Sequence, residues 1–221
     1  MLQLATSTPM TNAESLMAGA EWLRVLLNRT ATCLHEERWG DIATEPRTFT
    51  AKDGRKITIR SIKWEDLDQV LDMINSLVDE EALIYRRTRV ERSEEADWLG
   101  KRLARIDKGE IIDAIAEVDG KVVGNSEVER RTKDMSHVGH FGIAIRSGYR
   151  GIGVGTAMVR TLVEESKKAG LKLIVLDRHE TNEPARRLYE KMGFKETGRV
   201  PKGIYRDGKY TDLVRMVLEL E

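Results

Sequence analysis

A glycine-rich turn between a strand and a helix most constrains what this chain can form. Residues 143–155 read Ile-Ala-Ile-Arg-Ser-Gly-Tyr-Arg-Gly-Ile-Gly-Val-Gly, and apolar residues alternate along the strand predicted before the turn. From Val154 onward apolar residues recur at helical spacing, until Ala169-Gly170 ends the helix. Glycines let a ligand approach bare backbone, and the first N–H groups of a helix have no partner within it. The turn is therefore the predicted functional centre, suited to an anion such as phosphate.

Length and composition limit the class of protein. A chain of 221 residues makes one large domain, or one domain with an extension. Lys+Arg and Asp+Glu both number 37, so no basic field indicates a nucleic-acid partner. The single cysteine, Cys33, fits a reducing compartment, and no run resembles a membrane span or a signal peptide. The sequence predicts a cytoplasmic protein that binds neither nucleic acid nor membrane.

The N-terminal segment has a different pattern from the rest of the chain. Apolar residues fall on one helical face from Leu16 to Leu34, which predicts a helix over 12–35. Residues 36–46 are polar and end at Pro46, as in a linker. We therefore expect a helical extension at 1–46 and a separate domain at 47–221. The apolar stripe needs a partner, which favours packing or a homodimer.

The remaining elements predict an α/β protein with a mixed sheet. The strand-helix-strand unit around the glycine turn predicts a parallel pair of strands, because a crossover of this length joins parallel neighbours. The other strands are joined by short turns, as in antiparallel hairpins. The predicted strands are 48–52, 56–62, 111–118, 121–131, 137–146, 171–176, 194–200 and 210–219, and the predicted helices are 67–78, one starting near Ser93, the one after the turn, and 182–192.

Two motifs together resemble one known family. Arg150-Gly-Ile-Gly-Val-Gly155 is similar to the Arg/Gln-x-x-Gly-x-Gly/Ala loop of the GNAT superfamily, the acyl-CoA-dependent N-acetyltransferases. Residues 182–194 resemble the family's second motif, Asn-x-x-Ala-x-x-x-Tyr-x-x-x-Gly-Phe. The order of elements agrees over 56–220, with Ser147 in place of a proline that many members carry. The resemblance implies a mostly antiparallel mixed sheet (α/β, or α+β in some schemes) with a central, splayed parallel strand pair, flanked by helices.

The resemblance also implies a reaction. Acetyl-CoA is the implied cosubstrate, without a metal, and a primary amine attacks its thioester directly in a ternary complex. The helix N-terminus suits the pyrophosphate, and the strand ending at Ile145 suits the pantetheine arm. By resemblance Tyr189 is the acid that protonates the departing thiolate. The implied cofactor-binding residues are Ile143, Ala144, Ile145, Arg150, Gly151, Ile152, Gly153, Val154, Gly155, Thr156, Asn182, Ala185 and Tyr189.

The base that takes the amine's proton has several candidates. His140 lies on the strand before the turn, where several relatives that acetylate small amines carry a carboxylate. Asp177 stands five residues before Asn182, at the position of a glutamate in enzymes similar to the ribosomal-protein N-terminal acetylases. A histidine titrates near neutrality, whereas an aspartate base needs a raised pKa. Both can equally be ordinary strand residues, and Glu127 and Glu129 are alternatives on the adjacent strand.

The acceptor and two rival functions stay open. The acceptor is a small-molecule amine or a protein N-terminus or lysine. Four arginines (Arg86, Arg87, Arg89 and Arg92) either favour a carboxylate-bearing acceptor or belong to a solvated loop. A non-catalytic acyl-CoA-binding regulatory protein is the first rival. A dinucleotide-binding module is the second, although the Gly-x-Gly-x-x-Gly/Ala spacing fails at Thr156 and at Met158.

Overall fold

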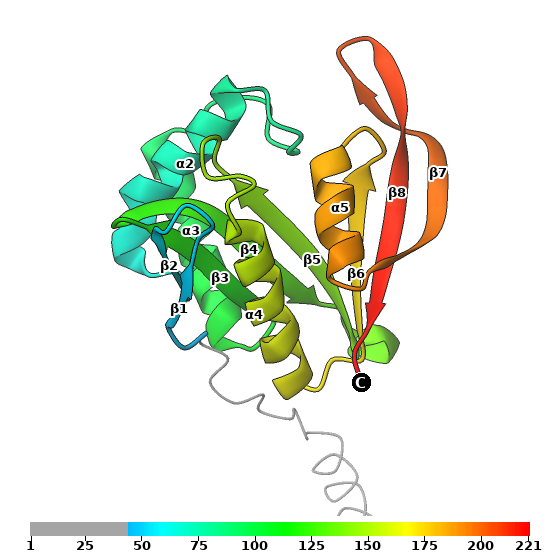
Figure 1. Cartoon of the computed structure of the whole chain (residues 1–221), viewed down its shortest axis with the longest axis horizontal. Coiled ribbons are helices and arrows are strands. Elements are labelled where there is room, and N and C mark those ends of the chain that lie inside the picture. The colour runs from blue at the N-terminus through cyan, green and yellow to red at the C-terminus, as the bar shows by residue number, and fades with distance from the viewer. Residues whose placement is uncertain (1–43) are drawn as a thin grey trace, which may run out of the picture. The chain divides into compact units, whose positions relative to one another are not determined.

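The computed structural model describes residues 44–221, which form an eight-stranded sheet with helices on both faces (Figure 1). The strand order is β1-β2-β3-β4-β5-β6-β8-β7. The predicted helix 12–35 lies outside the described residues. The division into an extension at 1–46 and a domain at 47–221 stays a prediction.

The elements follow the predicted order. The strands are β1 (Arg47–Thr50), β2 (Lys56–Arg60), β3 (Ile111–Val118), β4 (Lys121–Arg130), β5 (Val138–Ile145), β6 (Leu173–His179), β7 (Lys195–Arg206) and β8 (Lys209–Glu219). The helices are α2 (Leu67–Asp79), α3 (Arg92–Asp107), α4 (Val154–Lys168) and α5 (Glu183–Lys191), with short 3-10 helices η1 (Trp64–Asp66) and η2 (Lys133–Met135).

The central strands β5 and β6 form the one parallel pair of this sheet, and every other neighbouring pair in it is antiparallel. They pair at only three positions, of which His140 opposite Val175 is the last. Beyond it β5 stays paired with β4 as far as Ile145, while β6 stays paired with β8 as far as His179. The two strands therefore diverge toward the glycine turn, which leaves one backbone edge of residues 141–145 without a strand partner. The expected splayed pair is confirmed.

Helices cover the sheet from two sides. α4 and α5 pack on one face, where Phe141 and Leu176 belong to the larger apolar cluster. α2 and α3 pack on the other, around Ile115 and Leu99. Since side chains alternate along a strand, His140 on β5 and the odd-numbered residues of β6 lie on this second face.

Two strands differ most from their predicted ranges. β6 begins at Leu173, not 171, and continues through Asp177, Arg178 and His179, because β8 pairs along its whole length. β7 runs to Arg206 through a stretch predicted as loop. Its register shifts between Val200 and Ile204, and this irregularity contains the Pro201-Lys202-Gly203 segment that reads as a strand breaker.

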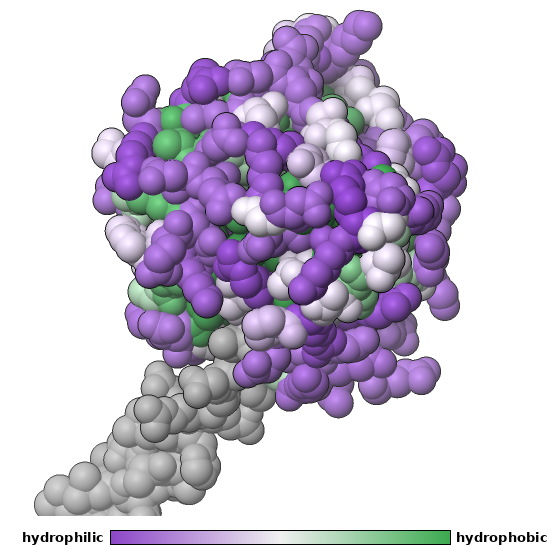
Figure 2. Space-filling view, turned by 60° about the vertical axis from the view of Figure 1, so that its left-hand side comes forward, coloured by the Kyte–Doolittle hydropathy of each residue, from purple (hydrophilic) through white to green (hydrophobic). Residues whose placement is uncertain are grey.

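The surface is largely polar. On the face shown in Figure 2, hydrophilic side chains dominate and apolar ones occupy scattered areas. None of the helices within residues 44–221 combines the length and the apolar character that a membrane span needs.

Candidate active site

The glycine turn presents the free N-terminus of α4. Gly151 and Gly153 have φ angles of 78° and 113°, in the left-handed region that favours glycine. Gly153 is the N-cap residue of α4, and no side chain caps this helix end. A Cβ added at Gly153 would meet nothing within 4 Å, so the space above the helix end is open. The first N–H groups of α4 therefore have no side-chain cap, and together with the helix dipole they are suited to an anion, as the sequence predicts.

Gly155 has a different role from the glycines before it. A Cβ at this position would lie 2.9 Å from Leu188 Cδ2 and 3.1 Å from Ile145 Cδ1. The first turn of α4 therefore packs directly against α5 and the end of β5. This contact holds the start of α4 beside the diverging strands.

Tyr189 lies on the same side of the sheet. Its ring packs edge-on against Phe141 of β5 at 6.0 Å between centroids, and against Phe194 at 5.7 Å. Only 7% of the residue is exposed. Burial raises the pKa of Tyr189 to about 12, with the charge of Arg178 acting in the opposite direction. The hydroxyl therefore carries its proton throughout the physiological range.

His140 and Asp177, singled out separately in the sequence, are neighbours on the opposite face. His140 Nε2 lies 3.4 Å from Asp177 Oδ2. Arg215 of β8 holds the same carboxylate from the other side, with Nε 2.9 Å from Oδ1 and Nη2 2.8 Å from Oδ2. The Arg215 guanidinium, helped by His140, lowers the pKa of the Asp177 carboxyl, although burial opposes this shift. The imidazole thus stands at the last paired position before the strands diverge.

The comparisons with known proteins agree with this arrangement. The family model described as the acetyltransferase (GNAT) family matches residues 71–194. The chain belongs to this family. It is therefore a GNAT acyltransferase, and the reading as a dinucleotide-binding module is excluded.

Individual relatives of this GNAT protein extend the comparison. It is 28% identical to an N-alpha-acetyltransferase of Sulfurisphaera tokodaii over 72% of this chain and 92% of that one. It is 33% identical to an L-amino acid N-acetyltransferase of Escherichia coli over 52% of this chain and 72% of that one. A Salmonella typhimurium protein solved with acetyl-CoA shares the fold, with a TM-score of 0.66 and 23% identity over 75% of this chain and 94% of that one.

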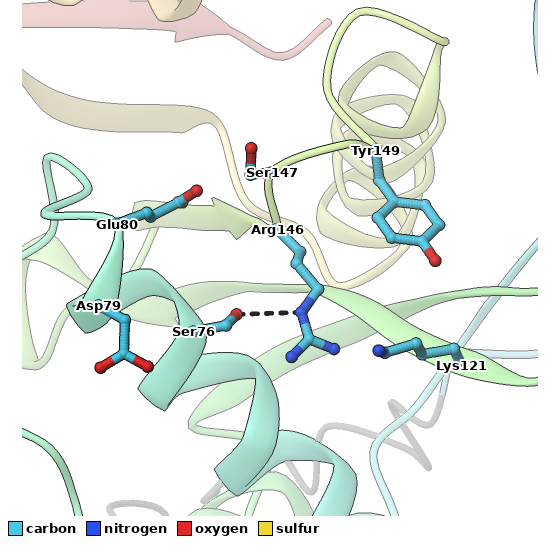
Figure 3. A pocket seen from close by; sticks show the side chains of 7 residues that line it. All are labelled: Ser76, Asp79, Glu80, Lys121, Arg146, Ser147 and Tyr149. Atoms are coloured by element: carbon cyan, nitrogen blue, oxygen red, sulfur yellow. Dashed lines mark hydrogen bonds between the residues drawn. The ribbon is translucent and has the colours of Figure 1, made fainter.

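Arginines tie the glycine turn of this GNAT domain to α2. Arg150 Nε donates to Ile145 O at 2.7 Å, and its guanidinium also pairs with Glu80. Arg146 Nε donates to Ser76 Oγ at 3.0 Å (Figure 3). A groove of about 570 Å³ opens here, lined by Ser76, Asp79, Glu80, Lys121, Arg146, Ser147 and Tyr149. The sequence predicts cofactor contact for Arg150, and the structure shows that its side chain also fixes the end of β5.

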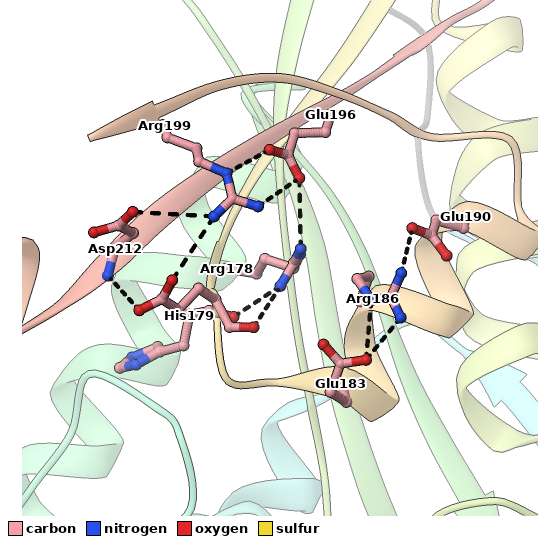
Figure 4. Close-up of polar contacts among 9 residues, drawn as sticks. Arg178, His179, Glu183, Arg186, Glu190, Glu196, Arg199 and Asp212 are labelled. Carbon is pink, nitrogen blue, oxygen red and sulfur yellow. Dashed lines mark hydrogen bonds and ion pairs between the residues drawn. The ribbon is translucent and has the colours of Figure 1, made fainter. Parts of the chain in front are cut away.

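An ion-pair network fixes the start of α5 (Figure 4). Arg178 is buried, and its Nη1 donates to the carbonyls of His179 and Glu180, both at 3.1 Å. Asn182 is the N-cap of α5, and its Oδ1 accepts from the N–H of Ala185 at 3.2 Å. These contacts set where α5 begins and so where Tyr189 stands. Arg178 was not predicted as a site residue, because it lies in β6 beyond the end of the apolar run 171–176.

The two glutamates on β4 are held by arginines of α3. Arg102 pairs with Glu127, and its Nη2 donates to the Ser126 carbonyl at 3.1 Å. Arg105 Nη2 lies 2.7 Å from Glu129 Oε1. Both carboxylates therefore have cationic partners on this face, which makes them weaker candidates for a base than His140.

Each arginine of the predicted basic cluster also has a carboxylate partner. Three pair with residues of α2 or α3: Arg86 with Glu94, Arg89 with Asp79 and Arg92 with Asp68. Arg87 instead reaches Asp207 in the β7–β8 turn, at 2.7 Å. The cluster therefore offers less positive charge to an acceptor than its sequence suggests.

A second contact joins the β7–β8 hairpin to the segment that follows α2, and here the arginine belongs to the hairpin. Arg206 Nη1 and Nη2 donate to the carbonyls of Ala82 and Glu81, at 2.9 and 2.5 Å. We call the Arg87 and Arg206 contacts the clasp.

Arg206 also acts on His179, which shares a face of β6 with Asp177. Burial of the imidazole and the positive charge of Arg206 both lower the pKa of His179.

Arg206→Met is expected to destabilise the domain by opening the clasp. The Arg206 side chain is only 14% exposed, and hydrogen bonds from a charged donor contribute about 1.5–3 kcal/mol. For a chain of this size the midpoint of thermal unfolding should fall by about 3–8 °C in a calorimetric scan. Arg87→Met is the matched control, since its exposed ion pair is worth less than about 1 kcal/mol. Equal unfolding midpoints for Arg206→Met and Arg87→Met would show that the buried Arg206 contacts contribute no more stability than the exposed Arg87 ion pair.

Proposed function

We propose that this protein transfers the acetyl group of acetyl-CoA to the α-amino group of an amino acid or of a protein N-terminus. One observation carries the proposal: β5 and β6 diverge after His140. The divergence brings together the free edge of residues 141–145, the open N-terminus of α4 and the buried Tyr189. A structural neighbour solved with acetyl-CoA supports the choice of cosubstrate.

Acetyl-CoA fits this region part by part. The N–H groups of Gly151 to Thr156 bind the pyrophosphate. The backbone of Ile143, Ala144 and Ile145 pairs with the pantetheine amides as an added strand would. Asn182 and Ala185 begin α5 on the other side of the arm.

The transfer itself is a direct attack in a ternary complex. The neutral amine attacks the thioester carbon, and an N–H near Ile145 stabilises the developing oxyanion. His140 takes the proton that the amine loses. Asp177 is a poor proton acceptor near neutrality, because Arg215 lowers the pKa of its carboxyl. The C–S bond then breaks, and Tyr189 gives its proton to the departing thiolate.

The names of two relatives support the proposed acceptor class. One is named an N-alpha-acetyltransferase and the other an L-amino acid N-acetyltransferase. Both names describe an amine carried by the carbon atom adjacent to a carbonyl group. A cytoplasmic location fits the single cysteine, and a homodimer through the N-terminal segment stays a prediction.

A thiol-release assay tests the function. Acetyl-CoA is incubated with the protein and with free amino acids, short peptides or α-blocked lysine, and free thiol is measured. We expect release with the first two groups and none above background with α-blocked lysine. Release with α-blocked lysine alone would contradict an α-amine acceptor, and binding of acetyl-CoA without release on any amine would contradict catalysis.

His140→Gln is expected to lower the acetyl-transfer rate at pH 7 by about 10–100-fold, at the lower end of what general bases contribute, because water can relay part of the proton. Affinity for acetyl-CoA should change little, since the cosubstrate contacts lie at and beyond Ile143. His137→Gln, on the chain just before β5, is the matched control. A rate for His140→Gln equal to that of the control would remove His140 as the base.

A further inference from the structure

Sheet register places Asp177 between His140 and Arg215. His140 is opposite Val175 across the parallel pair, and Asp177 is opposite Arg215 across the β6–β8 pair. The side chain of Asp177 is 11% exposed, whereas those of His140 and Arg215 are 31% and 54% exposed. The carboxylate is thus enclosed by its two partners, and solvent reaches the imidazole and the guanidinium.

Other charged groups face this part of the sheet from β4 and α3. Glu129 lies opposite His140 in register, and Arg105 of α3 holds its carboxylate. Glu127 lies opposite Gly142, paired with Arg102. Within residues 44–221, Asp177 is the ionisable side chain that a hydrogen bond or ion pair joins to His140. Its charge therefore acts on the imidazole most directly.

We propose that Asp177 and Arg215 are positioning residues that set the tautomer and the charge of His140. Asp177 accepts a hydrogen bond from His140 Nε2–H, which leaves Nδ1 with the lone pair that takes a proton. Arg215 holds the carboxylate in place with two bonds and offsets its negative charge. This inference rests on the proposed role of His140 as the base.

The two residues act on the imidazole with opposite signs. A carboxylate next to an imidazole favours the protonated imidazolium, so removing the charge of Asp177 lets the neutral form persist to lower pH. Removing the charge of Arg215 leaves Asp177 uncompensated, so the imidazolium persists to higher pH. A residue with only a packing role would not give opposite shifts.

The experiment follows the four histidines by NMR as pH is varied, in the full chain. His140→Gln identifies the His140 signal. We expect its titration midpoint to fall by about 0.5–1 pH unit in Asp177→Asn and to rise by about 0.5 unit in Arg215→Met, which are modest shifts because the site is partly solvated. In the unaltered chain, ¹⁵N shifts should report the Nε2–H tautomer at neutral pH.

Two controls separate charge from structure. Arg215→Lys keeps the charge and should keep the midpoint within about 0.2 unit. Arg199→Met removes an exposed arginine that pairs with Glu196 on β7, and should also leave the midpoint unchanged. Shifts of the same sign in Asp177→Asn and Arg215→Met, no shift in either, or an Nδ1–H tautomer would overturn the proposal. These readouts do not depend on turnover. The NMR results can therefore contradict this inference while His140→Gln still slows acetyl transfer, and they can support it while His140→Gln leaves the rate unchanged.

Discussion

Replacing Tyr189 with phenylalanine is expected to lower acetyl transfer by about 10²–10⁴-fold while affinity for acetyl-CoA changes little. The change removes the hydroxyl and keeps the ring that packs against Phe141 and Phe194. Folding should therefore be preserved, and the leaving thiolate loses its proton donor. Steady-state rates on an accepted amine, paired with calorimetric binding of acetyl-CoA, measure both quantities.

Three outcomes can be told apart. If Tyr189 serves only in packing, Tyr189→Phe should match the unaltered protein in both transfer rate and affinity for acetyl-CoA. That result would show that Tyr189 is not the acid. A fall in affinity alongside the rate would show that the hydroxyl mainly anchors the cosubstrate. Tyr205→Phe is the matched control, since Tyr205 is 65% exposed and stacks on Tyr210 in the terminal hairpin.

Gly153→Val is expected to weaken acetyl-CoA binding by about 100-fold or more. Position 153 has a φ of 113° and caps α4, so a β-branched residue is strained there and places two methyl groups over the N–H groups. An anion can no longer approach the helix end. Calorimetric titration of acetyl-CoA measures the loss.

Two further variants separate strain from obstruction. Gly153→Ala shares the unfavourable backbone angle and adds little bulk, so it should retain more affinity than valine. Gly208 in the β7–β8 turn also has a positive φ, 78°, and a Cβ placed there, as in Gly208→Val, meets open space. This variant should cost stability without weakening acetyl-CoA binding. Unchanged affinity in Gly153→Val would place the pyrophosphate elsewhere.

The elements that carry short-range signals were predictable from sequence. Strand alternation up to Ile145, the glycines of the turn and the N-cap residue Asn182 each act within a few residues of chain. The parallel pair followed from the length of the crossover between Ile145 and Leu173. These local rules were enough to place the turn, α4 and α5 in the right order.

Features that depend on register were not predictable. Whether His140 meets Asp177 depends on how β5 and β6 align, and the three pairs that set this alignment have no sequence signature. The apolar run 171–176 stops before Asp177, although pairing with Arg215 continues the strand through it. Likewise, the clasp joins Arg206 to Glu81, 125 residues away. Such contacts form only after the fold has brought segments that are distant in the sequence close together.

The divergence of β5 and β6 also has a mechanical consequence. The sheet consists of two plates, β1 to β5 and β6 to β8, and strand pairing across the seam between them is confined to three residue pairs at one end. The aromatic group of Phe141, Tyr189 and Phe194 bridges the seam on one face. A ligand that lies along residues 141–145 joins the backbone edges of the two plates where no strand pairing does. We therefore expect acetyl-CoA, bound as proposed, to stiffen the sheet across the seam, and the sheet to loosen there again when the product leaves.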